Sequence, residues 1–452
     1  MQFQELFKDK QFYKSLFTIA IPIMLQNLVN SFVNMVDTVM IGRLGSVEIA
    51  AVGLGNQFFF LFSMILFGIC SGGAIFTAQF WGKQDIQGIR KNTGLCLILN
   101  SSVALVFTIL ILAAPEKIIS IYTRDPAVVE AGTSYLKNLA PSFIPFGISF
   151  VFIITLRSVE KVRLAMVTTI IALSINITLN YLFIFGIGPF PAMGVVGAAR
   201  ATVIARISEM IILVTLTYLK GYAPAGNLRE LMILSSSFTA RFFQITLPVI
   251  INETLWSLGV TLQNIIVART NTDAIAAFNI TSTLSQLTWV VFIGLGNGVG
   301  VLIGKKIGEG EEKTARDYAS RITVFNTLLG AGAAIILFFL SKLIPLVFNV
   351  NPRVLAYTAS MFIVLSCSYP FRSFNMSMVV GICRAGGDTV FCVIYDLIFM
   401  WLVALPAAAA ASFIFHAPVW IIYFCISSEE FLKTILGFWR LKTGRWLHNV
   451  TE

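Results

Sequence analysis

The sequence predicts an all-α polytopic membrane protein with twelve transmembrane helices in two pseudo-symmetric six-helix lobes. Three observations predict it: the composition, the regular spacing of long apolar runs, and an internal repeat. Of the 452 residues, 57% are hydrophobic and only 12% are charged, whereas a soluble domain carries about 25% charged residues. Each apolar run is long enough to cross about 30 Å of hydrocarbon as a helix.

The apolar runs place twelve helices along the chain. We expect them near 15–41, 49–80, 94–114, 139–156, 164–187, 195–219, 242–268, 275–304, 322–348, 355–381, 391–414 and 417–439. The longest link falls between the sixth and seventh runs. The sequence therefore predicts an N-lobe over 1–219, a cytoplasmic linker over 220–241 and a C-lobe over 242–452.

The positive charge of the chain lies in the links between the apolar runs. The net charge is +10, and Lys and Arg gather in the links that would face the cytoplasm if the N-terminus lies inside. This pattern sets the topology of membrane proteins, so it does not indicate a nucleic-acid partner. We expect a multi-pass protein of the plasma membrane, of the bacterial inner-membrane type, with both termini in the cytoplasm.

The two halves of the chain repeat each other. A shift of 226 positions aligns Ile19–Gly82 with Ile245–Gly308 without a gap, and Pro22 then coincides with Pro248. Because six spans separate the copies, both halves have the same orientation in the membrane. Parallel repeats of this kind are a design of secondary transporters, with substrate bound between the halves. The alternative is an ancient duplication without mechanistic meaning.

The first predicted helix carries polar side chains on one face. Asn30, Asn34 and Asp37 follow each other at spacings of four and three, which places them together. Asp37 lies about 8 Å below the outer end of the helix. A charge at a helix centre costs roughly 2.5–3.5 kcal/mol on insertion scales, so Asp37 needs partners, water or a proton. A carboxyl that alternates between a proton and a metal cation suits an ion-coupled exchanger. The alternative is a structural hydrogen bond to a neighbouring helix.

Several motifs together resemble one known family. They are "IPIMLQNLVNSFVNMVDTVMIGRLGSVEIAAVGL", "NITLNYLFIFGIG" followed by "MGVVGAARATVIAR", and "GICRAGGDT". The chain is similar to the multidrug and toxic compound extrusion (MATE) family over nearly its whole length. The resemblance implies efflux of amphipathic organic cations in exchange for H⁺ or Na⁺ by alternating access. It implies small organic cations and the lipid bilayer as partners. We expect a monomer that is not an enzyme and needs no cofactor besides the coupling ion.

The resemblance also implies which residues couple the ion in the N-lobe. Asn176 and Asn180, one turn apart in the fifth helix, match the family motif that forms a cation site with the first-helix carboxylate, here Asp37. These three residues would hold Na⁺ if the transporter is sodium-coupled, and Thr202 is a plausible fourth oxygen donor. Carboxylate, amide and hydroxyl oxygens suit such hard cations. The alternative for the asparagines is a structural contact between helices.

The second lobe matches the family pattern less well. Glu253 is a candidate coupling residue but lies about one turn earlier than the pattern expects, and Ser373 stands where an aspartate is expected. This departure shifts the expected coupling toward Asp37. Near the inner end of the last helix, Glu429 and Glu430 are predicted to pair with Lys433. The candidates for the substrate cavity are Gln26, Asn30, Asn34, Trp256 and Trp289.

Two other functions stay open. A lipid-linked saccharide flippase of the same superfamily would need a cationic cavity, for which Arg200, Arg206 and Arg372 are candidates. A membrane-embedded enzyme is the remote alternative. It would need a catalytic constellation, but the chain has only two histidines, one near an outer helix end and one in the tail.

Overall fold

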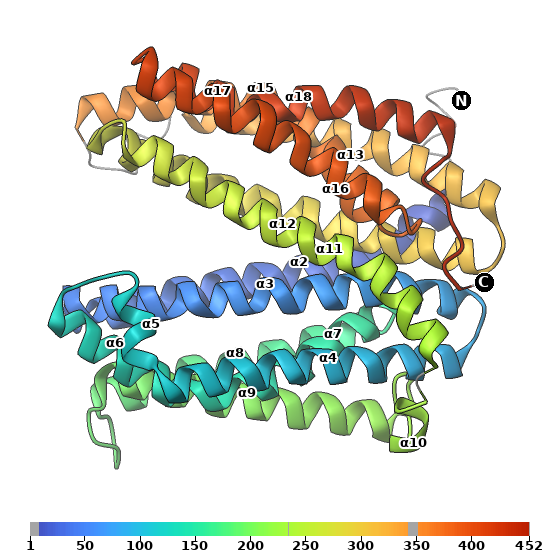
Figure 1. Cartoon of the computed structure of the whole chain (residues 1–452), viewed down its shortest axis with the longest axis horizontal. Helices are drawn as coiled ribbons and strands as arrows, with labels where there is room; N and C mark the ends of the chain where they lie inside the picture. Colours follow the sequence, from blue (N-terminus) through green and yellow to red (C-terminus); the bar gives the residue numbers. More distant parts are fainter. Residues whose placement is uncertain (1–8, 234, 342–350, 452) are drawn as a thin grey trace. The chain divides into compact units, whose positions relative to one another are not determined.

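The computed structural model describes residues 9–233, 235–341 and 351–451 and is almost entirely helical in these ranges. Figure 1 shows the helices in chain order. They are α2 (Lys10–Gly42), α3 (Ser46–Gly82), α4 (Ile86–Ala113), α5 (Pro115–Ser120), α6 (Pro126–Leu139), α7 (Phe143–Ser158), α8 (Val162–Phe185), α9 (Gly194–Leu219), α10 (Leu228–Leu231), α11 (Ser236–Ala268), α12 (Thr272–Gly308), α13 (Glu312–Ser341), α15 (Pro352–Met376), α16 (Thr389–Phe399), α17 (Leu405–Ala409) and α18 (Val419–Thr443).

Short irregular helical segments join some of these elements. A 3₁₀ turn, Ala140–Ser142, joins α6 to α7, so that one span runs over Pro126–Ser158. π-helical segments, η2 (Ser377–Cys383), η3 (Met400–Ala404) and η4 (Ala410–Ile414), extend α15, α16 and α17. Side chains cap several helix starts. For example, the Asp85 carboxylate accepts a hydrogen bond from the Gly88 amide at the start of α4, which satisfies an amide that lacks a helical partner.

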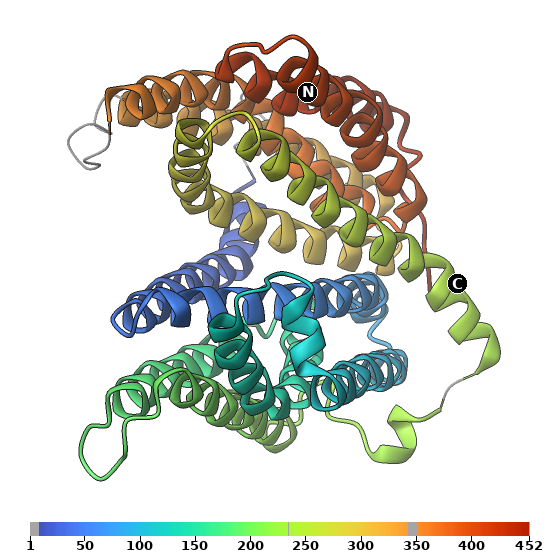
Figure 2. The same cartoon turned by 60° about the vertical axis from the view of Figure 1, so that its left-hand side comes forward.

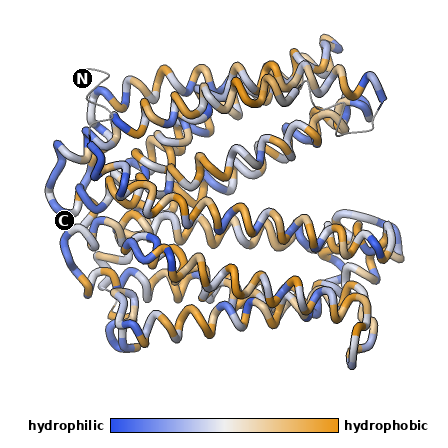
Figure 3. Tube along the Cα trace, turned by 180° about the vertical axis from the view of Figure 1, so that it is seen from behind, coloured by the Kyte–Doolittle hydropathy of each residue, from blue (hydrophilic) through white to orange (hydrophobic). Residues whose placement is uncertain are grey.

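The predicted all-α membrane fold is confirmed. Eleven helices in the described part of the chain are long and apolar enough to cross a membrane. The twelfth predicted span matches α18, whose middle carries Glu429, Glu430 and Lys433. The last part of the ninth predicted span, 342–348, lies outside the described residues. Figure 3 shows hydrophobic residues along the helix bodies and hydrophilic residues gathered near helix ends and links.

Two compact units make up the chain. The N unit is Leu25–Phe243, and the C unit comprises the described residues of Met1–Met24 and Gln244–Glu452. The helices α2 and α11 therefore each contribute residues to both units. Within the N unit, α8 lies beside α9, and within the C unit α13 lies beside α15, as Figure 1 and Figure 2 both show.

The internal repeat is visible in the helix lengths. Both α2 and α11 contain 33 residues with a proline inside, and both α3 and α12 contain 37 residues. A shift of 226 positions carries the bounds of α2 onto those of α11, and those of α3 onto those of α12. The duplicated sequence thus forms the same pair of long helices twice.

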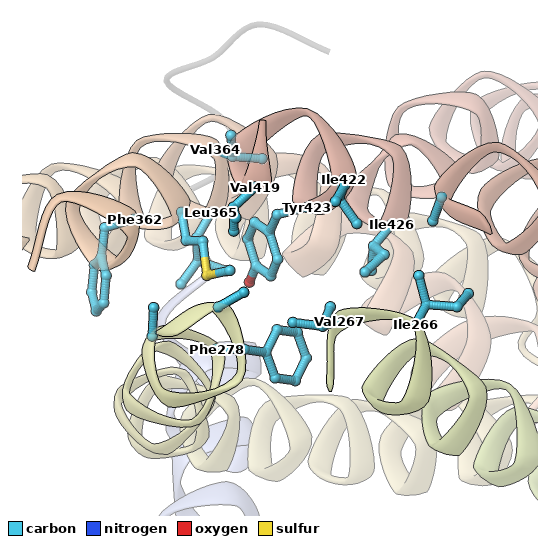
Figure 4. Close-up of a cluster of buried hydrophobic side chains, with 14 of the residues drawn as sticks. Ile266, Val267, Phe278, Phe362, Val364, Leu365, Val419, Ile422, Tyr423 and Ile426 are labelled. Carbon is cyan, nitrogen blue, oxygen red and sulfur yellow. The ribbon is translucent and has the colours of Figure 1, made fainter. Parts of the chain in front are cut away.

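Each unit has its own apolar core. In the N unit, the fully buried rings of Phe62 and Phe143 lie 4.5 Å apart. In the C unit, Phe278 of α12 and Tyr423 of α18 meet edge to face within the cluster drawn in Figure 4. Such aromatic contacts add to the stability that apolar burial provides. These cores fix the rotation of the helices that carry the polar residues described below.

Candidate functional site

Asp37 lies on α2, five residues before the helix ends at Gly42, and its side chain is half-buried. The Asn180 side chain donates a hydrogen bond of 2.7 Å from its Nδ2 to Asp37 Oδ1. Asn180 belongs to α8 and is 1% exposed. The predicted proximity of the first-helix carboxylate and the fifth-helix asparagine is therefore found in the structure.

A chain of hydrogen bonds extends from this contact across three helices. Asn180 Nδ2 also lies 3.3 Å from Asn176 Oδ1, and Asn176 Nδ2 donates at 3.3 Å to Thr202 Oγ1 on α9. The structure thus brings together the four predicted N-lobe residues. We call them the Asp37 cluster: Asp37, Asn176, Asn180 and Thr202.

The Asp37 cluster has room in its hydrogen-bonding pattern for a cation or a proton. Within the described part of the chain, the buried Asn180 Oδ1 has no hydrogen-bond partner. A buried acceptor without a donor costs about 1–3 kcal/mol. A carboxylate beside a free amide oxygen is a donor set that a hard cation prefers. A proton on the carboxylate is the other way to compensate its charge.

The predicted cavity residues of α2 differ in their surroundings. Asn34 is exposed and Asn30 is half-buried. Gln26 is buried, 3% exposed, and accepts a hydrogen bond from Arg157 Nη2 on α7. Its own Nε2 donates to Thr169 Oγ1 on α8 at 2.7 Å. Gln26 thus has protein partners at both ends of its amide.

The bonds from Gln26 lead to a buried acid that sequence reasoning missed. Thr169 Oγ1 donates to Glu209 Oε1 at 2.8 Å, and Arg206 Nη1 lies 2.8 Å from Glu209 Oε2. Glu209 is 1% exposed. Its signal in the sequence was an acid three residues after an arginine within the sixth predicted helix, which is α9. Two opposite charges at this spacing share one helix face.

In the C unit, Glu253 forms a buried ion pair with Arg384. Glu253 belongs to the C unit and Asp37 to the N unit, so the structure does not group Glu253 with the Asp37 cluster. Ser373 is 1% exposed and donates to the Pro370 carbonyl oxygen. Trp256 and Trp289, the other predicted cavity residues, are partly buried against the apolar cluster of Figure 4.

The charged residues of α18 pair with more than one helix. Lys433 Nζ lies 3.2 Å from Glu429 Oε2, as the spacing predicted. Glu430 does not pair with Lys433. Its Oε1 lies 3.2 Å from Arg372 Nε of α15 instead, because Glu430 is one residue further round the helix and faces α15. The three charged residues of α18 are buried, whereas Arg372, the partner of Glu430, is half-buried.

Comparison with known proteins identifies the same family twice in this chain. The family model described as MatE matches residues 22–182 and again residues 248–410. The two matches begin 226 residues apart, in agreement with the internal repeat. Together they cover most of both halves.

Relatives and solved structures of similar length match this chain over nearly its whole length. The chain is 23% identical over 445 residues to the uncharacterized transporter YisQ of Bacillus subtilis, covering 97% of this chain and 96% of that protein. It is 24% identical to the probable multidrug resistance protein NorM of Thermotoga maritima, covering 96% and 93%. A mutant of the Vibrio cholerae MATE transporter VcmN has a similar fold, with a TM-score of 0.88 at 16% identity over 98% of this chain and 99% of that one.

A further solved structure is described in terms of its polarity. It is a transporter of the MOP superfamily from Pyrococcus furiosus, said to have a binding pocket of reversed polarity that suggests a different function. Its TM-score with this chain is 0.84 at 18% identity, over 95% of each chain. Likeness at this identity shows a shared fold.

Proposed function

Because the chain belongs to the MatE family of membrane transporters, we propose that it is a multidrug efflux antiporter. It exports amphipathic organic cations in exchange for H⁺ or Na⁺ by alternating access. The observation that carries this proposal is the contact of 2.7 Å between Asn180 and Asp37 inside the N unit. The relative named a probable multidrug resistance protein supports the substrate class.

The Asp37 cluster supports exchange because the negative charge of its one carboxylate must be neutralised or paired in every conformation of the transporter. An ionisable group within a membrane-spanning segment is costly unless it is paired, hydrated or neutralised. If the coupling ion and the cationic cargo both compensate Asp37, binding of one favours release of the other. This competition is the thermodynamic core of antiport.

The coupling ion would be held by oxygens already in place. Asp37, Asn176 and Asn180 would bind Na⁺ in a sodium-coupled protein, with Thr202 as a fourth donor, and Asp37 alone would bind a proton. The free Asn180 Oδ1 supports either reading, since it lacks a donor within the described residues. We place the protein in the plasma membrane as a monomer with both termini cytoplasmic.

The flippase alternative needs unpaired cationic groups, and two of its three candidates are paired with acids. Arg206 lies against Glu209 and Arg372 against Glu430. Arg200 is exposed and its Nε donates to Asn138 Oδ1 at 3.3 Å. Pairing cancels most of the positive potential that a pyrophosphate group would need. These pairs therefore favour cationic cargo.

Dye export from proteoliposomes tests the proposal. A sodium gradient and a proton gradient are imposed in separate experiments. Wild-type protein should export a cationic dye under at least one of them, and the gradient that drives export identifies the coupling ion. Asp37→Asn should reduce export to the level of protein-free liposomes, because the variant carboxamide cannot be charged. The matched control is Glu116→Gln, which removes an exposed carboxylate of α5 in the same unit.

Two outcomes would contradict the proposal. Full export by Asp37→Asn under both gradients would remove Asp37 from the coupling. Translocation of a labelled lipid-linked saccharide, without export of any cationic dye, would favour the flippase.

A further inference from the structure

Two carboxylates of the C unit share one ammonium group. Lys433 Nζ lies 3.2 Å from Asp396 Oδ1 and 3.2 Å from Glu429 Oε2. Asp396 belongs to α16, and the other two residues belong to α18. Lys433 is only 3% exposed. This arrangement places two potential negative charges beside one positive charge, in a site where Glu429 and Lys433 are buried and Asp396 is half-buried.

The surrounding ion pairs supply no further positive charge. Arg384 pairs with Glu253, and Arg372 pairs with Glu430. Titratable and charged groups surround the site on α11, α15, η2, the turn after η2, α16 and α18. The carboxylates are Glu253, Asp396, Glu429 and Glu430, and the cations are Arg372, Arg384 and Lys433. The thiols of Cys383 and Cys392 and the phenols of Tyr369, Tyr395 and Tyr423 complete the set. Among these described groups, the carboxylates exceed the cations by one.

An amide in the same cluster also lacks a donor. Asn252 is 2% exposed, and its Nδ2 donates at 3.1 Å to Asp396 Oδ2. Its Oδ1 is buried and has no hydrogen-bond partner within the described part of the chain. This unsatisfied acceptor belongs to the residue that contacts Asp396, and it is a second sign, independent of the charge count, that a donor is missing here.

A proton compensates this surplus best. An unpaired charge in a buried site costs several kcal/mol, and the usual response of a buried carboxyl group is to become neutral. A metal cation would have to displace the Lys433 ammonium from between the two carboxylates, whereas a proton needs no space of its own. We propose that the C unit binds one exchangeable proton, shared by Asp396 and Glu429 around Lys433.

The same places in the N unit carry neutral groups. A shift of 227 positions carries Thr169 onto Asp396 and Arg157 onto Arg384, whereas the shift of 226 that aligns α2 with α11 carries Gln26 onto Asn252. The Arg157–Gln26 and Arg384–Glu253 bonds each span 131 residues. The N unit therefore shows that threonine is accepted at the position of Asp396 in this scaffold, and Asp396→Thr is a conservative test of the site.

Infrared spectroscopy in the Asp37→Asn background tests the proposal apart from the proposed function. The purified full-length variant should still show one protonated carboxyl band at neutral pH that disappears at alkaline pH. Adding Glu429→Gln or Asp396→Thr should remove this band, because each leaves three carboxylates against three cations. Glu230→Gln, which removes a half-buried acid paired with Arg90, should leave the band in place.

The outcomes separate the alternatives. No titrating band in the Asp37→Asn protein, or a band that survives both C-unit substitutions, would overturn the proposal. Loss of the band on adding Na⁺ at constant pH would replace the proton by a metal cation and overturn it as well. None of these results depends on whether Asp37 couples transport.

Thermal unfolding gives a second measurement that does not depend on the band. A carboxyl group that holds its proton more tightly when folded contributes stability at low pH, and this contribution is lost as the pH rises. The unfolding midpoint of the Asp37→Asn protein should therefore fall on going to alkaline pH. Glu429→Gln should flatten that fall, and an unchanged slope would contradict the shared proton.

Discussion

Arg157 and Arg384 occupy equivalent places in the two halves of the chain but bind chemically different partners. In the N unit, Arg157 donates to the neutral amide of Gln26. In the C unit, Arg384 pairs with the carboxylate of Glu253. A second bond also differs, since Gln26 donates to the hydroxyl of Thr169 in the N unit, whereas Asn252 donates to the carboxylate of Asp396 in the C unit. The duplicated scaffold kept its geometry while its charges changed.

The reverse asymmetry holds for the Asp37 cluster. The repeat places Gln263 at the C-lobe equivalent of Asp37, at a shift of 226 positions, and Val403 and Ala407 at those of Asn176 and Asn180, at a shift of 227. The C half therefore has no carboxylate at that level of its first helix. The comparison teaches that the two halves hold their acids at different positions of one scaffold: in the N unit beside asparagines, in the C unit among cations.

The two units also differ in how the segment that follows their last long helix packs against the rest of the unit. In the N unit, Leu231 of α10 lies against Gly94 so closely that an added Cβ would lie 1.8 Å from the Leu231 carbonyl oxygen. In the C unit, the tail after α18 buries Trp446 completely over Gly386 and donates from the His448 amide to the Gly386 carbonyl oxygen. Glycine is required in both places because backbones approach closely.

The largest expected effect concerns the packing of the two segments that follow the last long helix of each unit. Trp446→Ala removes a fully buried indole and should cost about 3–5 kcal/mol of unfolding free energy. Leu231→Ala removes a smaller, slightly exposed side chain and should cost about 2 kcal/mol. Equilibrium unfolding in mixed detergent micelles measures both. Equal costs would show that the tail contributes no more to its unit than α10 does.

The second effect concerns the two arginines. Arg384→Gln leaves the buried Glu253 without its counter-charge and should cost about 3 kcal/mol, the low end of the range for breaking buried pairs. Arg157→Gln leaves only a neutral amide without its donor and should cost about 1–2 kcal/mol. The same unfolding assay compares them. A larger cost for Arg157→Gln would mean that charge pairing is not what distinguishes the units.

Much of the fold was predictable from the sequence because it depends on local hydropathy. The helix bodies were predicted correctly, but several helix ends were placed too far inward. For example, α4 begins at Ile86 and not near residue 94. The missed first turns carry Arg90, Lys91 and Asn92, which end an apolar run without ending a helix.

Spacing within a helix predicted that Asn176 and Asn180 share one face and that Asp37 lies on a polar face of its helix. Their grouping into one cluster was what the family resemblance implied, and the structure shows the contacts. The contacts of Glu253 with Arg384 and of Glu209 with Thr169 were not predictable. A bond that spans 131 residues depends on the rotation of two helices about their axes, which the packing of the whole unit sets.

The smallest expected effect concerns the turn between η2 and α16, where the N unit carries Lys161 in place of Asp388. Burial raises the pKa of the Asp388 carboxyl above its ordinary value, although the Arg440 guanidinium, 2.7 Å away, opposes the rise. The folded state then binds this proton more tightly than the unfolded state. Its contribution to stability is complete below the unfolded pKa of about 3.9 and is lost as the pH rises through the folded value.

In the wild type, the unfolding midpoint should decline between strongly acidic and mildly acidic pH, and Asp388→Asn should make this decline smaller. The same substitution removes the ion pair with Arg440, which should lower the midpoint at neutral pH. The matched control is Asp317→Asn, which removes a more exposed carboxylate that is paired with Arg321. A steeper decline in Asp388→Asn than in the wild type would mean that the ion pair outweighs burial at this turn. The C unit would then hold Asp388 by attraction to Arg440, as a charge that folding stabilises.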